Sequence, residues 1–269
     1  MRKIIIATGD MHGNSTAGLC PPVVNLDDGG TYHASPFQRE MWRFWLDDLA
    51  YCKELAKNGK FSKPSPILAI VGGDMAEGDA KDRSSQLISR NPKTILNIAC
   101  ANLEPLSEIA QAMYFLRGTA AHVGKSASMD EQVAANFDNT VKASESVASR
   151  WELRLNIDGY KIYASHHPPG MTNPVNAAKK LLNKYYSYGE QPPDLGVFFH
   201  IHHIADSGLT MTPRVISAPC WQVHTEHIHR IPIMQAPQIG VLILEITDGK
   251  LTRLEPRRHP FAMVQEIRA

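Results

Sequence analysis

The feature that most constrains this chain is a short apolar segment followed at once by residues that can bind a metal. Residues 4–7 read Ile-Ile-Ile-Ala and end just before Asp10-Met11-His12, where a carboxylate and an imidazole two positions apart can both reach one ion. The same kind of cluster recurs four times: Gly73-Asp74, Gly118-Thr119 with His122, His166-His167, and His200-Ile201-His202. Five such clusters in this order predict a site that binds two metal ions.

The remaining pattern alternates between strand-like and helix-like segments. Apolar runs predict strands at 3–8, 66–72, 113–116, 195–199, 214–217, 240–246 and 251–254. Apolar periodicity and cap residues predict helices at 36–58, 93–111, 128–149 and 174–188. The third helix begins with Ser128-Met129-Asp130-Glu131, which has the form of a capping box. Asp158-Gly159, between the segments 151–156 and 160–165, predicts a tight hairpin.

These elements predict an α/β fold. Helices crowd the first two thirds of the chain and hairpins come late, so we expect a four-layer αββα sandwich of two mixed β-sheets flanked by helices. The sequence contains no internal repeat and no linker-like tract, which predicts one domain over residues 1–269.

Charge and cysteine content narrow the class of protein further. The chain has 28 Lys and Arg against 27 Asp and Glu, so its bulk charge favours neither nucleic acid nor membranes. Its four cysteines form no C-x-x-C pair, which is typical of reduced thiols and predicts a cytoplasmic location. No segment approaches the ~20 apolar residues that a membrane span needs, so no membrane partner is expected.

The types of ligand in the five clusters limit the choice of metal. Carboxylates and imidazoles without thiolates suit manganese, iron or zinc better than calcium or a structural zinc site. Two such ions about 3.5–4 Å apart can clamp a displacement at phosphorus and lower the pKa of a bridging water toward ~7. The bridging hydroxide is then the nucleophile. Taken singly, Asp10-Met11-His12 and Gly73-Asp74 would more often be a turn or a cap, and His166-His167 could belong to an ordinary loop. His200 and His202 resist that explanation, because two imidazoles at strand spacing share one face.

With these motifs, the sequence resembles the calcineurin-like metallophosphoesterase superfamily, whose motifs are D-x-H, G-D, G-N-H, H and G-H-x-H. The match covers roughly residues 3–217. The third motif, R-G-T-x-x-H from Arg117 to His122, is similar to a phage-type branch. The resemblance implies a hydrolase of phosphate esters with two divalent metal ions as cofactors. Phosphodiesters of nucleotides or nucleic acid are the expected substrates and partners.

The resemblance also implies roles for individual residues. Asp10, His12 and His202 would bind the first metal, and His166 and His200 the second. Asp74 would bridge both metals and is therefore treated as catalytic.

The third motif departs from the family pattern. Thr119 stands where most relatives have an asparagine ligand, and His122 arrives two residues late. Two alternatives follow for His122: it is the general acid for the leaving oxygen, which we favour, or it is itself a ligand of the second metal.

Five other residues are candidates for supporting roles. Asn14, Arg117 and Thr119 are predicted to contact substrate, while Glu77 and His167 are predicted to orient the ligands. The alternatives are a left-handed turn residue for Asn14, a structural ion pair for Arg117 and a solvated loop carboxylate for Glu77. His167 could also be a ligand in place of His166.

Three other functions compete with this prediction. A phosphomonoesterase or protein phosphatase is the nearest alternative. A binding module that keeps the fold and lacks catalysis is the second, although all six ligand positions carry ligand-type residues. A zinc-dependent amide or deaminating hydrolase would be expected to open with H-x-H instead of D-x-H.

Overall fold

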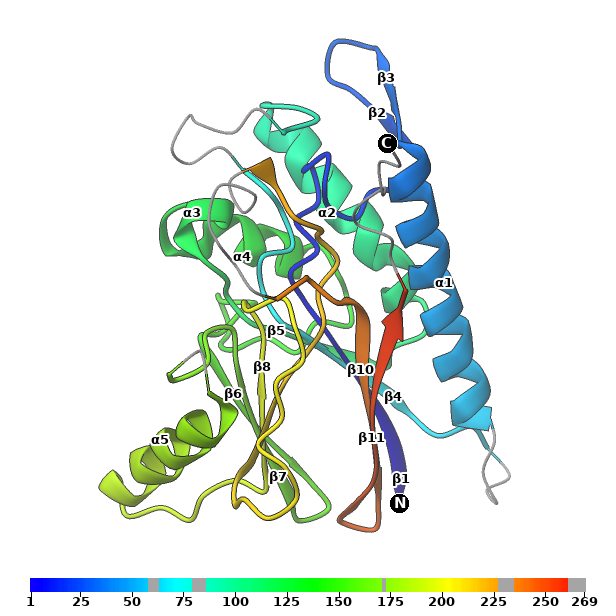
Figure 1. Ribbon diagram of the computed structural model, residues 1–269. Coiled ribbons are helices and arrows are strands. Elements are labelled where there is room, and N and C mark those ends of the chain that lie inside the picture. The colour runs from blue at the N-terminus through cyan, green and yellow to red at the C-terminus, as the bar shows by residue number, and fades with distance from the viewer. Residues whose placement is uncertain (58–62, 79–85, 171–172, 227–234, 261–269) are drawn as a thin grey trace, which may run out of the picture.

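The computed structural model describes residues 1–57, 63–78, 86–170, 173–226 and 235–260. Its larger sheet contains five strands (Figure 1). Their spatial order is β11 (Lys250–His259), β10 (Ile239–Thr247), β1 (Arg2–Thr8), β4 (Ile67–Val71) and β5 (Ala112–Phe115). Strands β1, β4 and β5 run parallel, whereas β10 is antiparallel to both β1 and β11, so the sheet is mixed.

A second sheet of four strands lies beside the first. Its order is β6 (Glu152–Ile157), β7 (Tyr160–Ser165), β8 (Leu195–Phe198) and β9 (Arg214–Ser217). The pair β6–β7 is antiparallel and β7, β8 and β9 are parallel, so this sheet is also mixed. A small hairpin, β2 (Val23–Asn25) and β3 (Thr31–His33), was not predicted from the sequence.

Three apolar clusters show how the layers are stacked. One lies between the first sheet and the helices α1 (Pro36–Lys57), α2 (Pro92–Ser107) and α4 (Ser128–Ala135). A second lies between the two sheets, and a third lies between the second sheet and helix α5 (Pro174–Ser187). On β1, Ile4 and Ile6 face the helices while Ile5 and Ala7 face the other sheet, as the two-residue period of a strand requires. The predicted α/β fold, with two mixed sheets and flanking helices, is confirmed.

The hairpin predicted at Asp158-Gly159 is present. It joins β6 to β7, and both turn residues have positive φ, 52° at Asp158 and 102° at Gly159. Two positive φ angles match the right-handed twist of the strands that the turn connects.

The helix predicted from Ser128 to Ser149 is too long, because α4 ends at Ala135. No capping box forms: residue 127 is the N-cap with φ 53°, and the Glu131 carboxylate accepts hydrogen bonds from the backbone of Ala148 and Ser149. The chain beyond α4 instead returns to the open edge of β5, where Arg150 forms a β-bridge with Leu116. Pairing with a sheet edge therefore outweighs local helix preference here.

Strand β11 is longer than the segment 251–254 predicted for it. The added length is explained by a buried carboxylate on α1, since Asp48 accepts hydrogen bonds from Arg257 at 2.7 Å and His259 at 3.0 Å. Helix α1 is described through Lys57, and its predicted end at Asn58 lies outside the described residues.

The register of the strands sets the position of the site. Thr8 pairs with Val71 and Val71 with Phe115, while Ser165 pairs with Phe198 in the other sheet. The parallel strands therefore end at one level, and the loops that follow them meet above the sheets (Figure 1). These loops also carry two short helices, α3 (Ala120–Val123) and the 3₁₀ segment η1 (Lys125–Ala127).

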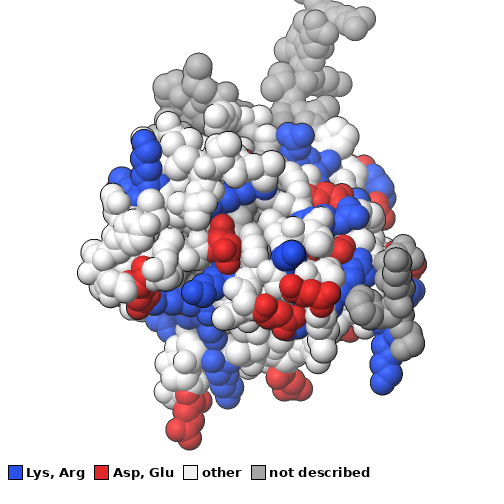
Figure 2. Space-filling view, turned by 90° about the horizontal axis from the view of Figure 1, so that it is seen from below, with Lys and Arg blue, Asp and Glu red and all other residues white. Residues whose placement is uncertain are grey.

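Figure 2 shows the opposite end of the molecule, seen from below. On the face drawn in Figure 2, basic and acidic side chains are interspersed, in line with the near-zero net charge of +1. Within the described residues, every helix is too short or too polar to span a membrane.

Candidate metal centre

Asp10, two residues beyond β1, carries a buried carboxylate with one unused oxygen. Its Oδ2 accepts the backbone N–H of His200 at 2.9 Å. Its Oδ1 lies 3.4 Å from His202 Nε2 and meets no donor in hydrogen-bond geometry within the described part of the chain. Buried polar atoms are nearly always satisfied. An unsatisfied carboxylate oxygen that faces an imidazole nitrogen is what a cation site requires.

His12 is oriented toward the same point by Glu77. Its Nδ1 donates to Glu77 at 2.5 Å, which leaves Nε2 facing His202 Nε2 at 3.3 Å. Metal-binding histidines usually donate their second ring nitrogen to a carboxylate in this way. Ligand atoms of Asp10, His12 and His202 all lie within 4.8 Å of one another, so the three residues predicted for the first metal come together.

Asp74, which follows β4, connects this group to a second one. Its Oδ1 accepts the backbone N–H of Thr119 at 2.6 Å, and its Oδ2 lies 3.1 Å from His166 Nε2. The Nδ1 of His166 donates to the carbonyl of Gly72, so its Nε2 points into the cluster. His200 Nδ1 lies 3.2 Å from that Nε2. The residues predicted for the second metal therefore also come together.

Glycines allow the loops to approach this closely. A Cβ atom on Gly118 would lie 2.2 Å from Asp74 Oδ1, and one on Gly72 would lie 2.2 Å from the ring of Phe199. Real Cβ atoms do not approach other atoms to such distances, so these positions require glycine.

Five of the six predicted ligands have a backbone conformation that residues other than glycine seldom adopt. Their φ angles are 50° at Asp10, 45° at His12, 53° at Asp74, 73° at His200 and 60° at His202. Such residues persist only where the surrounding structure holds them, and they concentrate at functional sites. The turns direct the ligand side chains into one space.

Carboxylates and imidazoles in this space stabilise each other's charges. Burial raises the pKa of Asp10, but the nearby imidazole of His202 outweighs it and lowers the pKa to about 2. Burial lowers the pKa of His166, but Asp74 and Asp10 outweigh it and raise the pKa to about 9. Buried carboxylates thus hold positive charge beside them, and divalent cations satisfy the same requirement.

His122 lies at the edge of the first group. Glu77 accepts hydrogen bonds from its Nδ1 at 2.8 and 3.0 Å, and its ring meets that of His12 edge-on at 4.7 Å. Burial lowers the pKa of His122, but the hydrogen bond and charge of Glu77 outweigh it, so the pKa is raised above its ordinary value. Glu77 is 12% exposed and binds two histidines, so it is not a solvated loop carboxylate.

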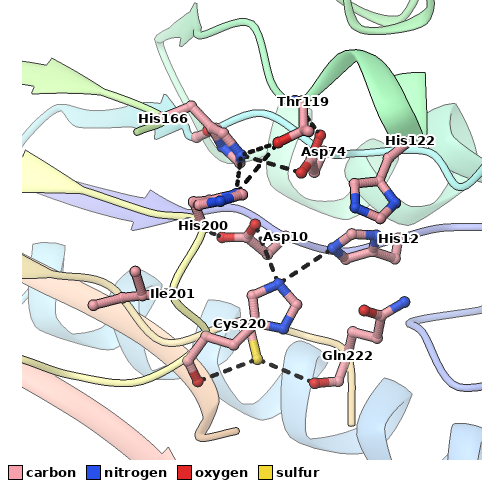
Figure 3. A network of polar contacts seen from close by, with 12 residues as sticks. Asp10, His12, Asp74, Thr119, His122, His166, His200, Ile201, Cys220 and Gln222 are labelled. Carbon is pink, nitrogen blue, oxygen red and sulfur yellow. Dashed lines mark hydrogen bonds and ion pairs between the residues drawn. The ribbon is translucent and has the colours of Figure 1, made fainter. Parts of the chain in front are cut away.

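Two residues predicted to contact substrate are engaged elsewhere. Asn14 is buried, with φ 88°, and its amide bonds the backbone of Glu77 and Ser89. Its left-handed conformation corresponds to the turn alternative. The Arg117 guanidinium binds Glu131 at 3.3 Å and Ser149 at 2.9 Å, which corresponds to the ion-pair alternative. Thr119, by contrast, faces the cluster (Figure 3).

One residue that sequence reasoning missed lies directly beneath the site. The fully buried carboxylate of Asp130 accepts backbone N–H groups from Asp74 and Met75, each at 3.1 Å, and from Gly118 at 2.8 Å. Burial and the charge of Asp74 raise its pKa to about 7. Asp130 therefore holds the loop after β4 against the loop after β5. In the sequence it is indistinguishable from an ordinary residue in the first turn of a helix.

Comparisons with known proteins give only distant likenesses. No family model and no curated protein matches the chain. A hypothetical protein from Pyrococcus horikoshii is 10% identical, with 97% of this chain and 89% of that chain covered and a TM-score of 0.48. Vps29 from Entamoeba histolytica, complexed with zinc, is 11% identical (95% and 98% covered, TM-score 0.45). A novel archaeal phosphodiesterase is 12% identical (94% and 98% covered, TM-score 0.41). Likenesses at this level do not assign the chain to a family.

We expect Asp130→Asn to destabilise the protein by about 1–3 kcal/mol, because its amide group would set a donor against backbone N–H groups. Urea unfolding of the chelator-treated protein measures this, and equilibrium dialysis should show weaker cation binding. Asp138→Asn, at an exposed aspartate, is the matched control. Unchanged stability and unchanged cation affinity in Asp130→Asn would show that the carboxylate does not hold the two loops.

Proposed function

We propose that this protein hydrolyses phosphate esters with two divalent cations, one bound by Asp10, His12 and His202 and the other by His166 and His200, with Asp74 between them. The observation that carries this proposal is that Asp10, Asp74 and His166 themselves form one compact group, which joins the two ligand sets. The unsatisfied Oδ1 of Asp10 supports a cation at this point. The donor set, oxygen and imidazole nitrogen without thiolate, suits manganese, iron or zinc.

Bound cations would supply Lewis-acid activation of the phosphoryl group and of water. The chain's own residues then have separate tasks. Glu77 fixes the ring of His12 through Nδ1, so that the other nitrogen is available as a ligand. The same carboxylate accepts a hydrogen bond from His122 Nδ1 and raises the pKa of the ring, which favours its protonated form and leaves Nε2 to donate a proton to the leaving oxygen. His122 is one-third exposed, as a group that meets substrate must be.

We infer a phosphodiester as the preferred substrate, with nucleotides or nucleic acid as the class. A monoester carries a second negative charge on its phosphate oxygens, and enzymes often bind that charged group with an arginine. Arg117, the arginine that opens the third motif, is already bound to Glu131 and Ser149. A diester makes a smaller demand for positive charge. A phosphomonoesterase is the second candidate, and a binding module without catalysis is the third.

A cytoplasmic location remains part of the proposal. It rests on the four cysteines, all of which are free thiols in the structure. Free thiols are the usual state in a reducing compartment.

The function is tested with bis-nitrophenyl and mono-nitrophenyl phosphate after chelation and reloading with manganese or zinc. We expect diester hydrolysis only with added cation, and Asp74→Asn should lose more than the ~10–100-fold lost when a residue that merely supports a ligand is removed. Asp47→Asn, on the exposed face of α1, is the control. Preference for the monoester would favour the second candidate. Cation binding without hydrolysis of either ester would favour the third.

The role of His122 is tested through the leaving group. His122→Ala should lose about 10²–10⁴-fold on a diester with a poor alkoxide leaving group, because protonation of that oxygen is then needed. The loss on a nitrophenyl ester should be much smaller. His33→Ala, at an exposed histidine on β3, is the control. Equal losses on both substrates would make His122 a metal ligand instead of the general acid.

The Glu77–His122 pair predicts a pH dependence. Because Glu77 raises the pKa of His122, the acid stays protonated to higher pH, and kcat should fall as pH rises through that pKa. Glu77→Gln removes the negative charge, so the alkaline limb of the kcat profile should move to lower pH under saturating cation. Glu54→Gln, at an exposed glutamate on α1, should leave the limb in place. A limb that does not move in Glu77→Gln excludes His122 as the titrating acid.

A further inference from the structure

Three imidazole nitrogens surround the hydroxyl of Thr119. Its Oγ1 lies 3.2 Å from His166 Nε2, 3.3 Å from His167 Nε2 and 3.3 Å from His200 Nδ1. His166 Nε2 and His200 Nδ1 are themselves 3.2 Å apart. The three histidines also form one of the compact ligand groups, with all their ligand atoms within 4.8 Å of one another. Figure 3 shows Thr119 facing the rings of His166 and His200.

Hydrogen bonds alone would require one particular set of histidine tautomers here. A hydroxyl has one hydrogen and two lone pairs, so Thr119 can donate to one of the three nitrogens and would have to accept an N–H from each of the other two. His166 already uses Nδ1 to donate to the carbonyl of Gly72, so in its neutral form it offers only a lone pair at Nε2. A cation, in contrast, accepts lone pairs from all four atoms at once.

The distances agree with tetrahedral coordination. For an ion bound at about 2.0–2.1 Å, four ligand atoms at the corners of a tetrahedron lie about 3.3–3.4 Å from one another. Four of the separations in this group are 3.2–3.3 Å. The arrangement therefore has the dimensions of a small tetrahedral site.

His167 completes the group on its solvent side. Of the three histidines, His166 is buried, His200 is partly exposed and His167 is exposed. Its ring packs against both neighbours, with ring centres 4.7 Å from His166 and 4.4 Å from His200. Removing an exposed ring should therefore alter the site without disturbing the core beneath it.

We propose that His167 is a direct ligand of the second cation, together with His166, His200 and the hydroxyl of Thr119. This inference rests on the proposed function, because it specifies the composition of the second of the two cation sites. Three imidazoles and a hydroxyl are neutral donors of borderline softness. The second site should therefore prefer zinc or cobalt over magnesium or calcium, with Asp74, 3.1 Å from His166 Nε2, placed between this cation and the first.

The test is equilibrium dialysis of the full chain with zinc, together with the visible absorption of the cobalt-loaded protein. We expect two equivalents of zinc in the parent protein. In His167→Ala, one equivalent should bind more weakly by more than the ~10–100-fold that removal of an indirect partner causes. The cobalt band of tetrahedral sites should lose intensity, while the other equivalent keeps its affinity.

Two further variants make the result specific. Thr119→Val keeps the shape of the side chain and removes the hydroxyl, so it should weaken the same equivalent. His33→Ala should change neither equivalent. Unfolding of the chelator-treated proteins checks that each variant folds like the parent.

The outcomes separate the two proposals. If His167→Ala keeps both equivalents with unchanged affinity and an unchanged cobalt band, His167 is not a ligand, and the proposed function still stands. If the parent protein binds no cation at all, the proposed function fails, and this inference fails with it.

Discussion

The site depends on the hydrogen bond between the Asp10 carboxylate and the backbone of His200, because this bond joins the two sheets at the ends of their parallel strands. Asp10 belongs to the loop after β1 in the first sheet, and its Oδ2 accepts the N–H of His200 from the loop after β8 in the second. The backbone of Asp10 is held by Gly73 and Trp221 as well. The candidate ligands from both sheets meet at this junction, so their arrangement depends on how the two sheets are stacked.

Much of this arrangement could be predicted from the sequence, because each ligand follows an apolar strand. Parallel strands in register must bring the residues that follow them to one edge, and Asp10, Asp74, His166 and His200 lie there. The hairpin at Asp158-Gly159 could also be predicted from the sequence, since few residue pairs adopt two positive φ angles. The local residue types and the strand register are sufficient to predict such features.

Other features depend on partners that a linear pattern does not reveal. The end of α4 is set by the edge of β5, and Glu131 binds the backbone of residues 148 and 149 instead of its own helix. Arg117 and Asn14 occupy plausible motif positions, yet their side chains are engaged by groups distant in sequence. The contacts of Asp130 were equally hidden from sequence-based prediction. Its three backbone donors come from two loops, and no residue near it in the sequence indicates them.

The left-handed turns at the ligands have a consequence for how such a chain could change. Each one costs about 1–3 kcal/mol relative to a relaxed conformation, and glycine would relieve the strain at all five positions. Each replacement would also remove the contacts of the side chain, such as the hydrogen bond that the backbone N–H of His200 donates to Asp10. A carboxylate or an imidazole at all five positions therefore combines backbone strain with side-chain contacts, and the proposed cation sites would account for that combination.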